Sequence, residues 1–249
     1  MRSRVPKEWC RDSHLTTTYG CAAHFAAGYI LGMMLRSSRF GPVLLLVACR
    51  PGVFAGAPEK SVPDTARIRR DVAYLASDAL EGRGTGTQGN DSAAAFIARQ
   101  FRAMGLAAPT AGFLQPFDAR PAAHQGIAAS LRTQNVVSLI PGRDPALRRQ
   151  YIVLGAHFDH LGRGTFGALD RQSINAIRNG ADDNASGTVA IMELARLLKE
   201  RPTRRSVAIV AFSGEELGLL GSAHFVANAP APLAIDSVQA MLNFDMVGR

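Results

Sequence analysis

The sequence predicts an α/β fold in three layers, with helices on both faces of one mostly parallel or mixed β-sheet. Apolar, β-branched segments alternate with amphipathic segments along the second half of the chain, and this alternation is typical of layered α/β proteins. The chain has 249 residues, of which 47% are hydrophobic and 19% are charged. This composition excludes a disordered or collagen-like chain and suits one globular domain.

Each expected helix and strand rests on its local pattern. Residues 66–80 carry apolar side chains at three- and four-residue spacing, which predicts a helix. Asp91 or Ser92 can cap a second helix that runs to Met104, and Gly105 is a typical helix end. The remaining expected elements are two helices, 186–200 and 216–228, and four strands, 135–140, 151–156, 206–212 and 238–244.

The formal net charge of +8 belongs almost entirely to the N-terminal part of the chain. Residues 1–70 contain eleven basic and four acidic side chains, whereas residues 71–249 contain 17 basic and 16 acidic ones. Aromatic residues make up 7% of the chain and do not alternate with basic residues, so the stacking surface of a single-strand binder is not indicated. No nucleic-acid partner is therefore expected.

Residues 34–57 have the pattern of a secretory signal peptide. Arg36 and Arg39 precede a short apolar run, and Ala55-Gly56-Ala57 provides small residues for cleavage. The apolar run is shorter than the roughly 20 residues that a membrane span needs. We therefore expect an exported protein, periplasmic or extracellular, whose translation starts near Met34.

The cysteines allow a second interpretation of the same segment. All three (Cys10, Cys21 and Cys49) lie in the expected leader, residues 1–57, so the expected domain of residues 58–249 can form no disulfide. Leu46-Val47-Ala48-Cys49 resembles a bacterial lipobox. Cleavage before Cys49 would leave a lipid-anchored protein instead of a freely soluble one.

Residues 84–89 match the glycine pattern of dinucleotide-binding loops, Gly-x-Gly-x-x-Gly. That pattern has physical meaning only between a strand and a helix, where a phosphate meets the helix N-terminus. The preceding segment belongs to the helix expected over 66–80, so no strand leads into this loop. We interpret it as a structural loop without a cofactor.

Ligand-type side chains stand where three expected strands end and where one expected helix begins. They are His157 and Asp159 after 151–156, Glu215 and Glu216 after 206–212, Asp245 after 238–244, and Asp182-Asp183-Asn184 before 186–200. In open α/β sheets ligands gather beyond the carboxyl ends of the strands, so these side chains are expected at one edge. Singly, each group is more often a cap or a solvated surface residue. Together, nitrogen and oxygen ligands suit Zn²⁺, with Mn²⁺ or Co²⁺ as alternatives.

Four motifs resemble the M28 family of zinc aminopeptidases. They are His157-Phe158-Asp159, the Gly-Ala-Asp-Asp-Asn-Ala-Ser-Gly run at 180–187, the Glu-Glu-Leu-Gly-Leu-Leu-Gly-Ser run at 215–222, and Asn243-Phe244-Asp245-Met246-Val247-Gly248. The resemblance extends over about residues 65–249, including the Leu-Glu-Gly-Arg-Gly-Thr-Gly-Thr loop. It implies a zinc-exopeptidase-like fold.

The resemblance also implies a role for each motif residue. His157 and Asp245 would bind one zinc ion, Asp183 would bridge two ions, and Glu216 would bind the second. Glu215 would be the general base that activates a metal-bridged water to hydrolyse the N-terminal bond of a peptide substrate, and Asp159 would orient His157. His160 and His224 have no role in the motifs, and we interpret them as structural or exposed.

The resemblance leaves three matters open. It implies a further His ligand and further strands and helices downstream of Asp245, so residues 58–249 are expected to lack the C-terminal part of the domain. Two alternatives to an aminopeptidase share the fold: a glutaminyl cyclase-like acyltransferase with one zinc, and a non-catalytic binding domain. The sequence does not determine residue specificity or oligomeric state.

Overall fold

The structure is a computed structural model that describes residues 62–122, 130–164, 168 and 175–248. The expected leader, residues 1–57, and the alternative anchor at Cys49 lie outside these residues. Within the described part of the chain, no helix combines the length and the apolar character that crossing a membrane requires.

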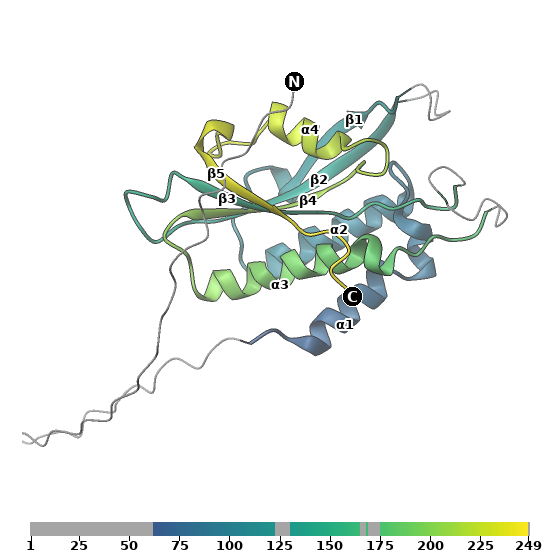
Figure 1. The fold of residues 1–249 in the computed structure, drawn as a ribbon, viewed down its shortest axis with the longest axis horizontal. Helices are drawn as coiled ribbons and strands as arrows, with labels where there is room; N and C mark the ends of the chain where they lie inside the picture. Colours follow the sequence, from purple (N-terminus) through teal and green to yellow (C-terminus); the bar gives the residue numbers. More distant parts are fainter. Residues whose placement is uncertain (1–61, 123–129, 165–167, 169–174, 249) are drawn as a thin grey trace, which may run out of the picture. The chain divides into compact units, whose positions relative to one another are not determined.

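One five-stranded mixed sheet organises the described residues (Figure 1). Its strands are β1 (Leu114–Ala119), β2 (Leu131–Ile140), β3 (Tyr151–His157), β4 (Ser206–Phe212) and β5 (Val238–Asn243), in the order β1-β2-β4-β3-β5. β3 runs parallel to β4 and β5, whereas β2 runs antiparallel to β1 and β4. The carboxyl ends of β3, β4 and β5 therefore meet at one edge, as predicted.

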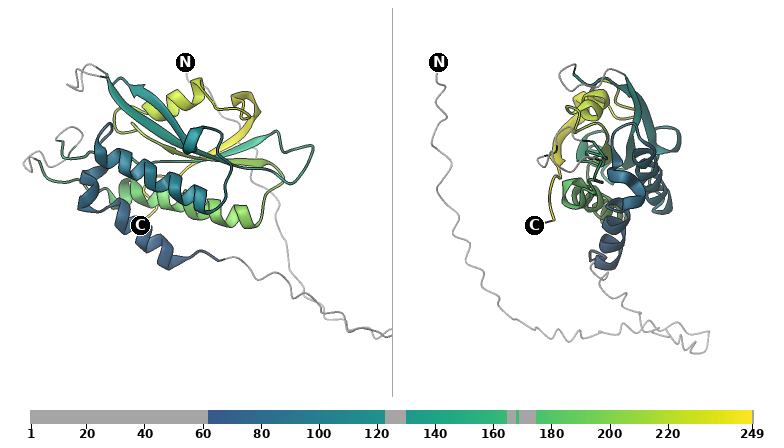
Figure 2. Two further views of the ribbon diagram at one scale, coloured as in Figure 1. Left: turned by 180° about the vertical axis from the view of Figure 1, so that it is seen from behind. Right: turned by 90° about the vertical axis from the view of Figure 1, so that its right-hand side faces the viewer.

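Helices cover both faces of the sheet, which confirms the predicted three layers. α1 (Thr65–Leu75), α2 (Gln88–Ala103) and α3 (Gly187–Glu200) lie on one face, and α4 (Leu220–Ala227) lies on the other (Figures 1 and 2). Inward side chains of alternate strand positions divide between two cores. Ile209 packs beneath α2 and α3, and its neighbour Val210 packs toward Phe225 of α4. This alternation follows from the two-residue period of a strand.

The helix expected over 66–80 ends at Leu75, and a kinked 3₁₀ helix, η1 (Asp78–Arg83), follows it. Glu81 and Gly82 have positive φ angles of 46° and 71°, a left-handed conformation that ends a right-handed helix. α2 begins at Gln88 with Thr87 as its cap, so it starts before Asp91 and Ser92, the caps that the sequence predicted. The glycine pattern at 84–89 thus follows η1 and not a strand, which agrees with a structural loop.

The helix expected over 216–228 begins four residues later, at Leu220. Gly218 and Leu219 have φ angles of 105° and 61°, so the backbone after β4 turns before the helix can start. The strand β1 was not predicted, because Pro116 stands in its centre and has no N–H to donate. An edge strand tolerates such a residue, and β1 is the edge strand next to β2.

Candidate metal centre

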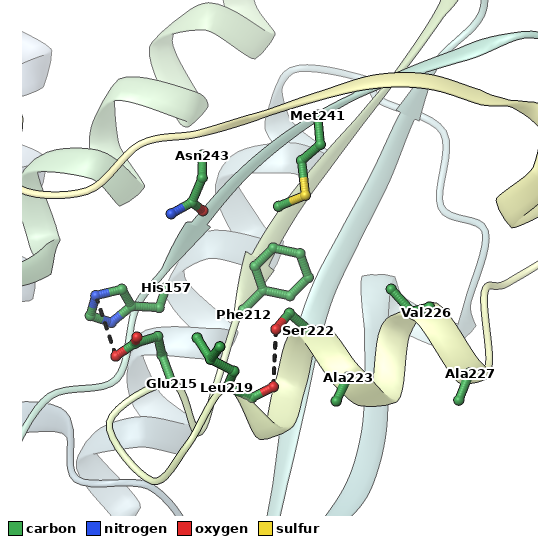
Figure 3. Close-up of a pocket in the computed structure, with 10 residues that line it drawn as sticks. All are labelled: His157, Phe212, Glu215, Leu219, Ser222, Ala223, Val226, Ala227, Met241 and Asn243. Atoms are coloured by element: carbon green, nitrogen blue, oxygen red, sulfur yellow. Dashed lines mark hydrogen bonds and ion pairs between the residues drawn. The ribbon is translucent and has the colours of Figure 1, made fainter. Parts of the chain in front are cut away.

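A cavity of about 680 Å³ opens between α4 and β5, beyond the carboxyl ends of β3 and β4 (Figure 3). Its walls are mostly apolar and come from α4 and β5, with Phe212 of β4 between them. His157 and Glu215 stand together at one end of the cavity. A polar pair therefore borders an apolar space large enough for a small ligand.

His157 is the centre of the ligand-type cluster. Its Nε2 lies 3.2 Å from Asp183 Oδ1, 3.5 Å from Asp245 Oδ1 and 4.0 Å from Glu215 Oε2. The imidazole is 3% exposed, whereas the Asp183 and Asp245 carboxylates are 37% and 42% exposed. The cluster is thus anchored in the sheet and open on its outer side.

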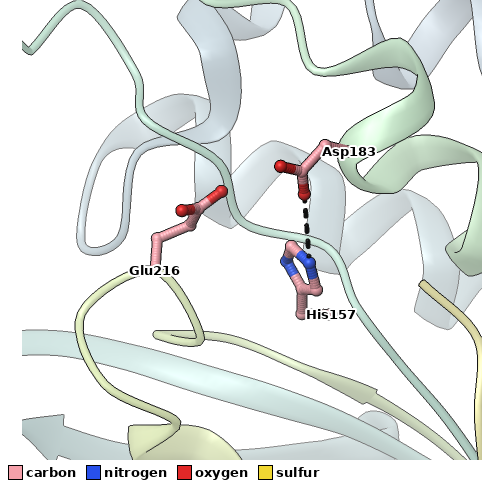
Figure 4. Close-up of side chains that lie close together, drawn as sticks. All are labelled: His157, Asp183 and Glu216. Atoms are coloured by element: carbon pink, nitrogen blue, oxygen red, sulfur yellow. Dashed lines mark ion pairs between the residues drawn. The ribbon is translucent and has the colours of Figure 1, made fainter. Parts of the chain in front are cut away.

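Glu216 belongs to the same cluster. One ligand atom each of His157, Asp183 and Glu216 lies within 4.8 Å of the others (Figure 4). The three side chains come from the end of β3, the turn before α3 and the turn after β4. An imidazole nitrogen with carboxylate oxygens at this spacing is a donor set that fits zinc.

The backbone around Asp183 is held by its neighbour Asn184. The Asn184 amide donates to the Phe244 carbonyl at 2.9 Å, and its oxygen accepts from the Gly187 and Met246 N–H groups. The peptide bond between Asp183 and Asn184 is cis. Because Phe244 precedes Asp245, Asn184 ties the loops that carry these two carboxylates to each other.

Asp159 is fully buried and contacts three parts of the site. Its carboxylate accepts hydrogen bonds from the Thr85 hydroxyl at 2.8 Å and from the Glu215 N–H at 3.2 Å. The backbone carbonyl of Asp159 lies 3.1 Å from His157 Nδ1, whereas its carboxylate is 3.8 Å away. A carbonyl only accepts, so Nδ1 carries the hydrogen and Nε2 is left for a ligand.

The negative charge of the cluster controls its protonation. Burial works against the charged imidazole, but the nearby carboxylates of Asp159 and Asp183 outweigh it and raise the pKa of His157 to about 11. The hydrogen bond to His157 lowers the pKa of Asp183. Burial, with Glu216 and the neighbouring aspartates, raises the pKa of Glu215. Four carboxylates around one imidazole make an anionic site that favours a divalent cation.

Arg83 lies behind the cluster and is completely buried. Its guanidinium donates to the carbonyls of Phe158 at 2.7 Å, Asn179 at 2.7 Å and Gly180 at 2.8 Å, and to that of Leu75. Burial lowers its pKa to about 10, so it remains charged at neutral pH. Arg83 thus joins the segment after β3 to the loop before Asp183.

Two further residues, His160 and Thr85, make contacts at this site that local sequence pattern does not reveal. His160 was interpreted as structural or exposed, but its Nδ1 lies 2.7 Å from Glu216 Oε1. Thr85 was part of a loop without an assigned role. The sequence signal for His160 was its position three residues after His157. His224, in contrast, lies on α4 and stacks on Phe117, with the ring centroids 4.8 Å apart.

A mixed sheet between helical layers, with imidazole and carboxylate ligands at the strand ends, defines the class of zinc-exopeptidase-like α/β proteins. Within that class, residues 135–249 match the model of peptidase family M28. This match contains all four candidate ligands, His157, Asp183, Glu216 and Asp245, and it agrees with the resemblance of the motifs to that family.

Two curated relatives show how far the likeness extends. A probable zinc metalloprotease of Leptosphaeria maculans is 30% identical over 187 residues, which make up 73% of this chain and 40% of that protein. An aminopeptidase of Bacillus subtilis is 44% identical over 69 residues, or 28% of this chain and 15% of that protein. The chain therefore spans less than half the length of either relative.

Solved structures agree on the fold. A leucine aminopeptidase precursor from Bacteroides thetaiotaomicron aligns with a TM-score of 0.60 at 20% identity, covering 76% of this chain and 64% of that one. A glutaminyl cyclase from Porphyromonas gingivalis aligns with a TM-score of 0.61 at 20% identity, covering 75% and 62%. At such identities the likeness shows the fold alone.

Proposed function

We propose that the protein is a zinc-dependent aminopeptidase that hydrolyses the N-terminal bond of peptides. The observation that carries this proposal is the place of Glu215, whose carboxylate lies 4.0 Å from His157 and borders the apolar cavity. A general base is thereby set between the candidate metal ligands and a space for substrate. The aminopeptidase among the curated relatives supports the same function.

The proposal assigns two zinc ions to the cluster. His157, Asp183 and Asp245 would hold the first ion, and Asp183 and Glu216 would hold the second. Bound zinc would polarise the scissile carbonyl and lower the pKa of the attacking water. Mn²⁺ or Co²⁺ suits the same nitrogen and oxygen donors.

Glu215 would carry the proton during hydrolysis. Its carboxylate accepts a proton as the water oxygen bonds to the carbonyl carbon, and returns it to the amine nitrogen as the C–N bond breaks. The raised pKa of Glu215, caused first by burial and then by neighbouring carboxylates, makes it a better proton acceptor than an exposed glutamate. The Asp159 carboxylate holds the Glu215 backbone in place for this transfer.

The cavity would receive the side chain of the first substrate residue. Val226 and Ala223 of α4 and Met241 of β5 line it, and none of them carries charge. An apolar wall favours an apolar substrate side chain, because a charged one would lose its hydration without a partner. A leucyl-nitroanilide should therefore be cleaved with a higher kcat/KM than a glutamyl-nitroanilide, and the reverse order would exclude this use of the cavity.

Replacing Glu215 by Gln tests the catalytic proposal. On the full chain, Glu215→Gln should keep its zinc content, because Gln retains the size of the side chain, while kcat for leucyl-nitroanilide falls by about 10²–10⁴-fold. Glu200→Gln, at the exposed end of α3, is the matched control and should keep wild-type kcat. A Glu215→Gln enzyme with near-wild-type turnover would show that Glu215 is not the base.

The same preparation distinguishes the other functions that share the fold. Conversion of an N-terminal glutaminyl peptide to its cyclic product, with no nitroanilide release, would support the glutaminyl cyclase-like alternative. A chain that takes up no zinc and turns over neither substrate would support a non-catalytic binding domain. Zinc uptake with chelator-sensitive nitroaniline release supports the aminopeptidase.

A further inference from the structure

We infer that His160 is a positioning residue that holds the metal ligand Glu216 by a hydrogen bond from Nδ1 to Oε1. The two atoms lie 2.7 Å apart. This inference deepens the proposed function and rests on it, because it concerns the site of the second zinc ion. Neither the motif resemblance nor the family match assigns His160 a role.

The partner of His160 is determined by distance. Its Nδ1 lies 2.7 Å from Glu216 Oε1 but 3.9 Å from Asp183 Oδ1, which is beyond hydrogen-bond range. An ionised carboxylate has no hydrogen to donate, so Nδ1 must carry it. The bond occupies one oxygen of Glu216 and leaves the second, Oε2, free for the metal.

The imidazole is clamped in this orientation by the surrounding backbone. The His160 N–H donates to the Arg83 carbonyl at 3.3 Å, and His160 forms an isolated bridge with Gly84. Gly180 lies against the ring so closely that a Cβ there would come within 2.6 Å of His160 Cγ and Cδ2. His160 is 12% exposed, so the ring has little room to turn.

This arrangement gives Glu216 a support that its own segment does not provide. Glu216 lies in the turn after β4, between Gly214 and Gly218, where both glycines have positive φ angles. A long side chain on such a turn has several rotamers, and the bond to His160 selects one before the metal arrives. Hydrogen-bond partners of metal ligands typically contribute about 10- to 100-fold to metal affinity.

Two substitutions on the full chain separate hydrogen bonding from packing. His160→Leu keeps an apolar side chain of similar size but removes the donor, whereas His160→Asn keeps an N–H near the position of Nδ1. His224→Leu is the matched control: it makes the same substitution at a histidine that stacks on Phe117 of β1 and is not part of the ligand cluster. The readout is the affinity for each of two Zn²⁺ ions, measured by competition with a chromophoric chelator.

We expect His160→Leu to weaken binding of one zinc ion by about 10- to 100-fold and to leave the other unchanged. The zinc affinities of His160→Asn should lie closer to those of the wild type, and the affinities of His224→Leu should equal those of the wild type. Wild-type affinities for both ions in His160→Leu would overturn the inference. Uptake of fewer than two zinc ions by the wild-type chain would overturn it as well.

A spectroscopic measurement on the wild-type chain covers the case in which His160→Leu does not fold. Long-range ¹H–¹⁵N spectra of the zinc-loaded protein should show the His160 ring protonated at Nδ1. Loss of that hydrogen on zinc binding would make His160 a ligand itself and would contradict a positioning role. Neither readout uses turnover, so a chain that binds two zinc ions but cleaves no peptide refutes the proposed function and leaves the His160 result intact.

Discussion

At the scale of single residues, His157 shows how a buried side chain is prepared for a cation. Its Nδ1 is engaged by the Asp159 carbonyl, and its Nε2 faces Asp183 and Asp245. The direction of the ring, with the Nδ1 hydrogen toward the Asp159 carbonyl, is set before any ion binds. An imidazole prepared in this way loses little conformational freedom when it coordinates zinc.

Zinc binding should release a proton from His157. In the metal-free protein the pKa of His157 is about 11, since Asp159 and Asp183 outweigh the effect of burial, so the ring is protonated at pH 7. An imidazole must be neutral to bind a metal, so zinc displaces about one proton from His157 and its affinity should rise about tenfold per pH unit between pH 7 and 9. Calorimetry in buffers of different ionisation enthalpy measures this release. An affinity independent of pH over that range would contradict it.

Arg83 is the residue whose loss should destabilise the fold most clearly. Arg83→Met would leave four carbonyls without their donor, two buried and two partly buried, and each buried unsatisfied group costs about 1–3 kcal/mol. We expect a loss of at least about 3 kcal/mol in the free energy of unfolding, measured by urea denaturation. Arg99→Met, on the exposed side of α2, is the control and should lose less than about 1 kcal/mol. Equal losses in the two variants would show that the buried network contributes little.

At the scale of elements, local sequence pattern predicted the bounds of the three parallel strands better than those of most helices. Residues 206–212 form β4 with the predicted bounds, because a short run of mostly apolar residues favours a buried strand, and all seven residues are buried. The helix ends were less accurate. At Glu81 and Leu219 the backbone takes positive φ angles in non-glycine residues, which periodicity does not reveal. The edge strand β1 depends on pairing with β2 and has only a weak signal of its own.

The start of α2 should depend on its cap. Thr87 accepts a hydrogen bond from the Asn90 N–H, and its hydroxyl donates to the Gly84 carbonyl. Thr87→Ala should therefore lower the free energy of unfolding by about 1 kcal/mol, whereas Thr87→Ser should remain near wild type. Thermal and urea denaturation measure both variants. If the Ala and Ser variants are equally stable, the cap is not a source of stability.

At the scale of the whole described domain, the candidate ligands join segments that are far apart in the sequence. His157 follows β3, Asp183 precedes α3, Glu216 follows β4 and Asp245 follows β5. A bound ion would therefore link four elements, and it binds the folded chain only. Metal binding should for this reason stabilise the complete domain and not one loop.

Removing the metal should lower the melting temperature. Zinc present at a hundredfold excess over its Kd contributes about 2.7 kcal/mol, which corresponds to roughly 5–10 °C for a domain of this size. Calorimetric scans with and without chelator measure the difference. Asp245→Asn, with weakened binding, should respond much less to chelator, and Glu200→Gln should respond as wild type does. A melting temperature unchanged by chelator in the wild-type chain would rule out a stabilising metal.

The sequence by itself determined the fold class, the three strands that end in ligand-type residues, and the resemblance to peptidase family M28. It did so because strand hydrophobicity and the motifs at strand ends are local signals. Only the tertiary structure decided what surrounds those ligands. Arg83, Thr85 and His160 contact the site through residues 56 to 97 positions away. Such contacts depend on how the sheet and loops pack, and no periodicity within one segment encodes them.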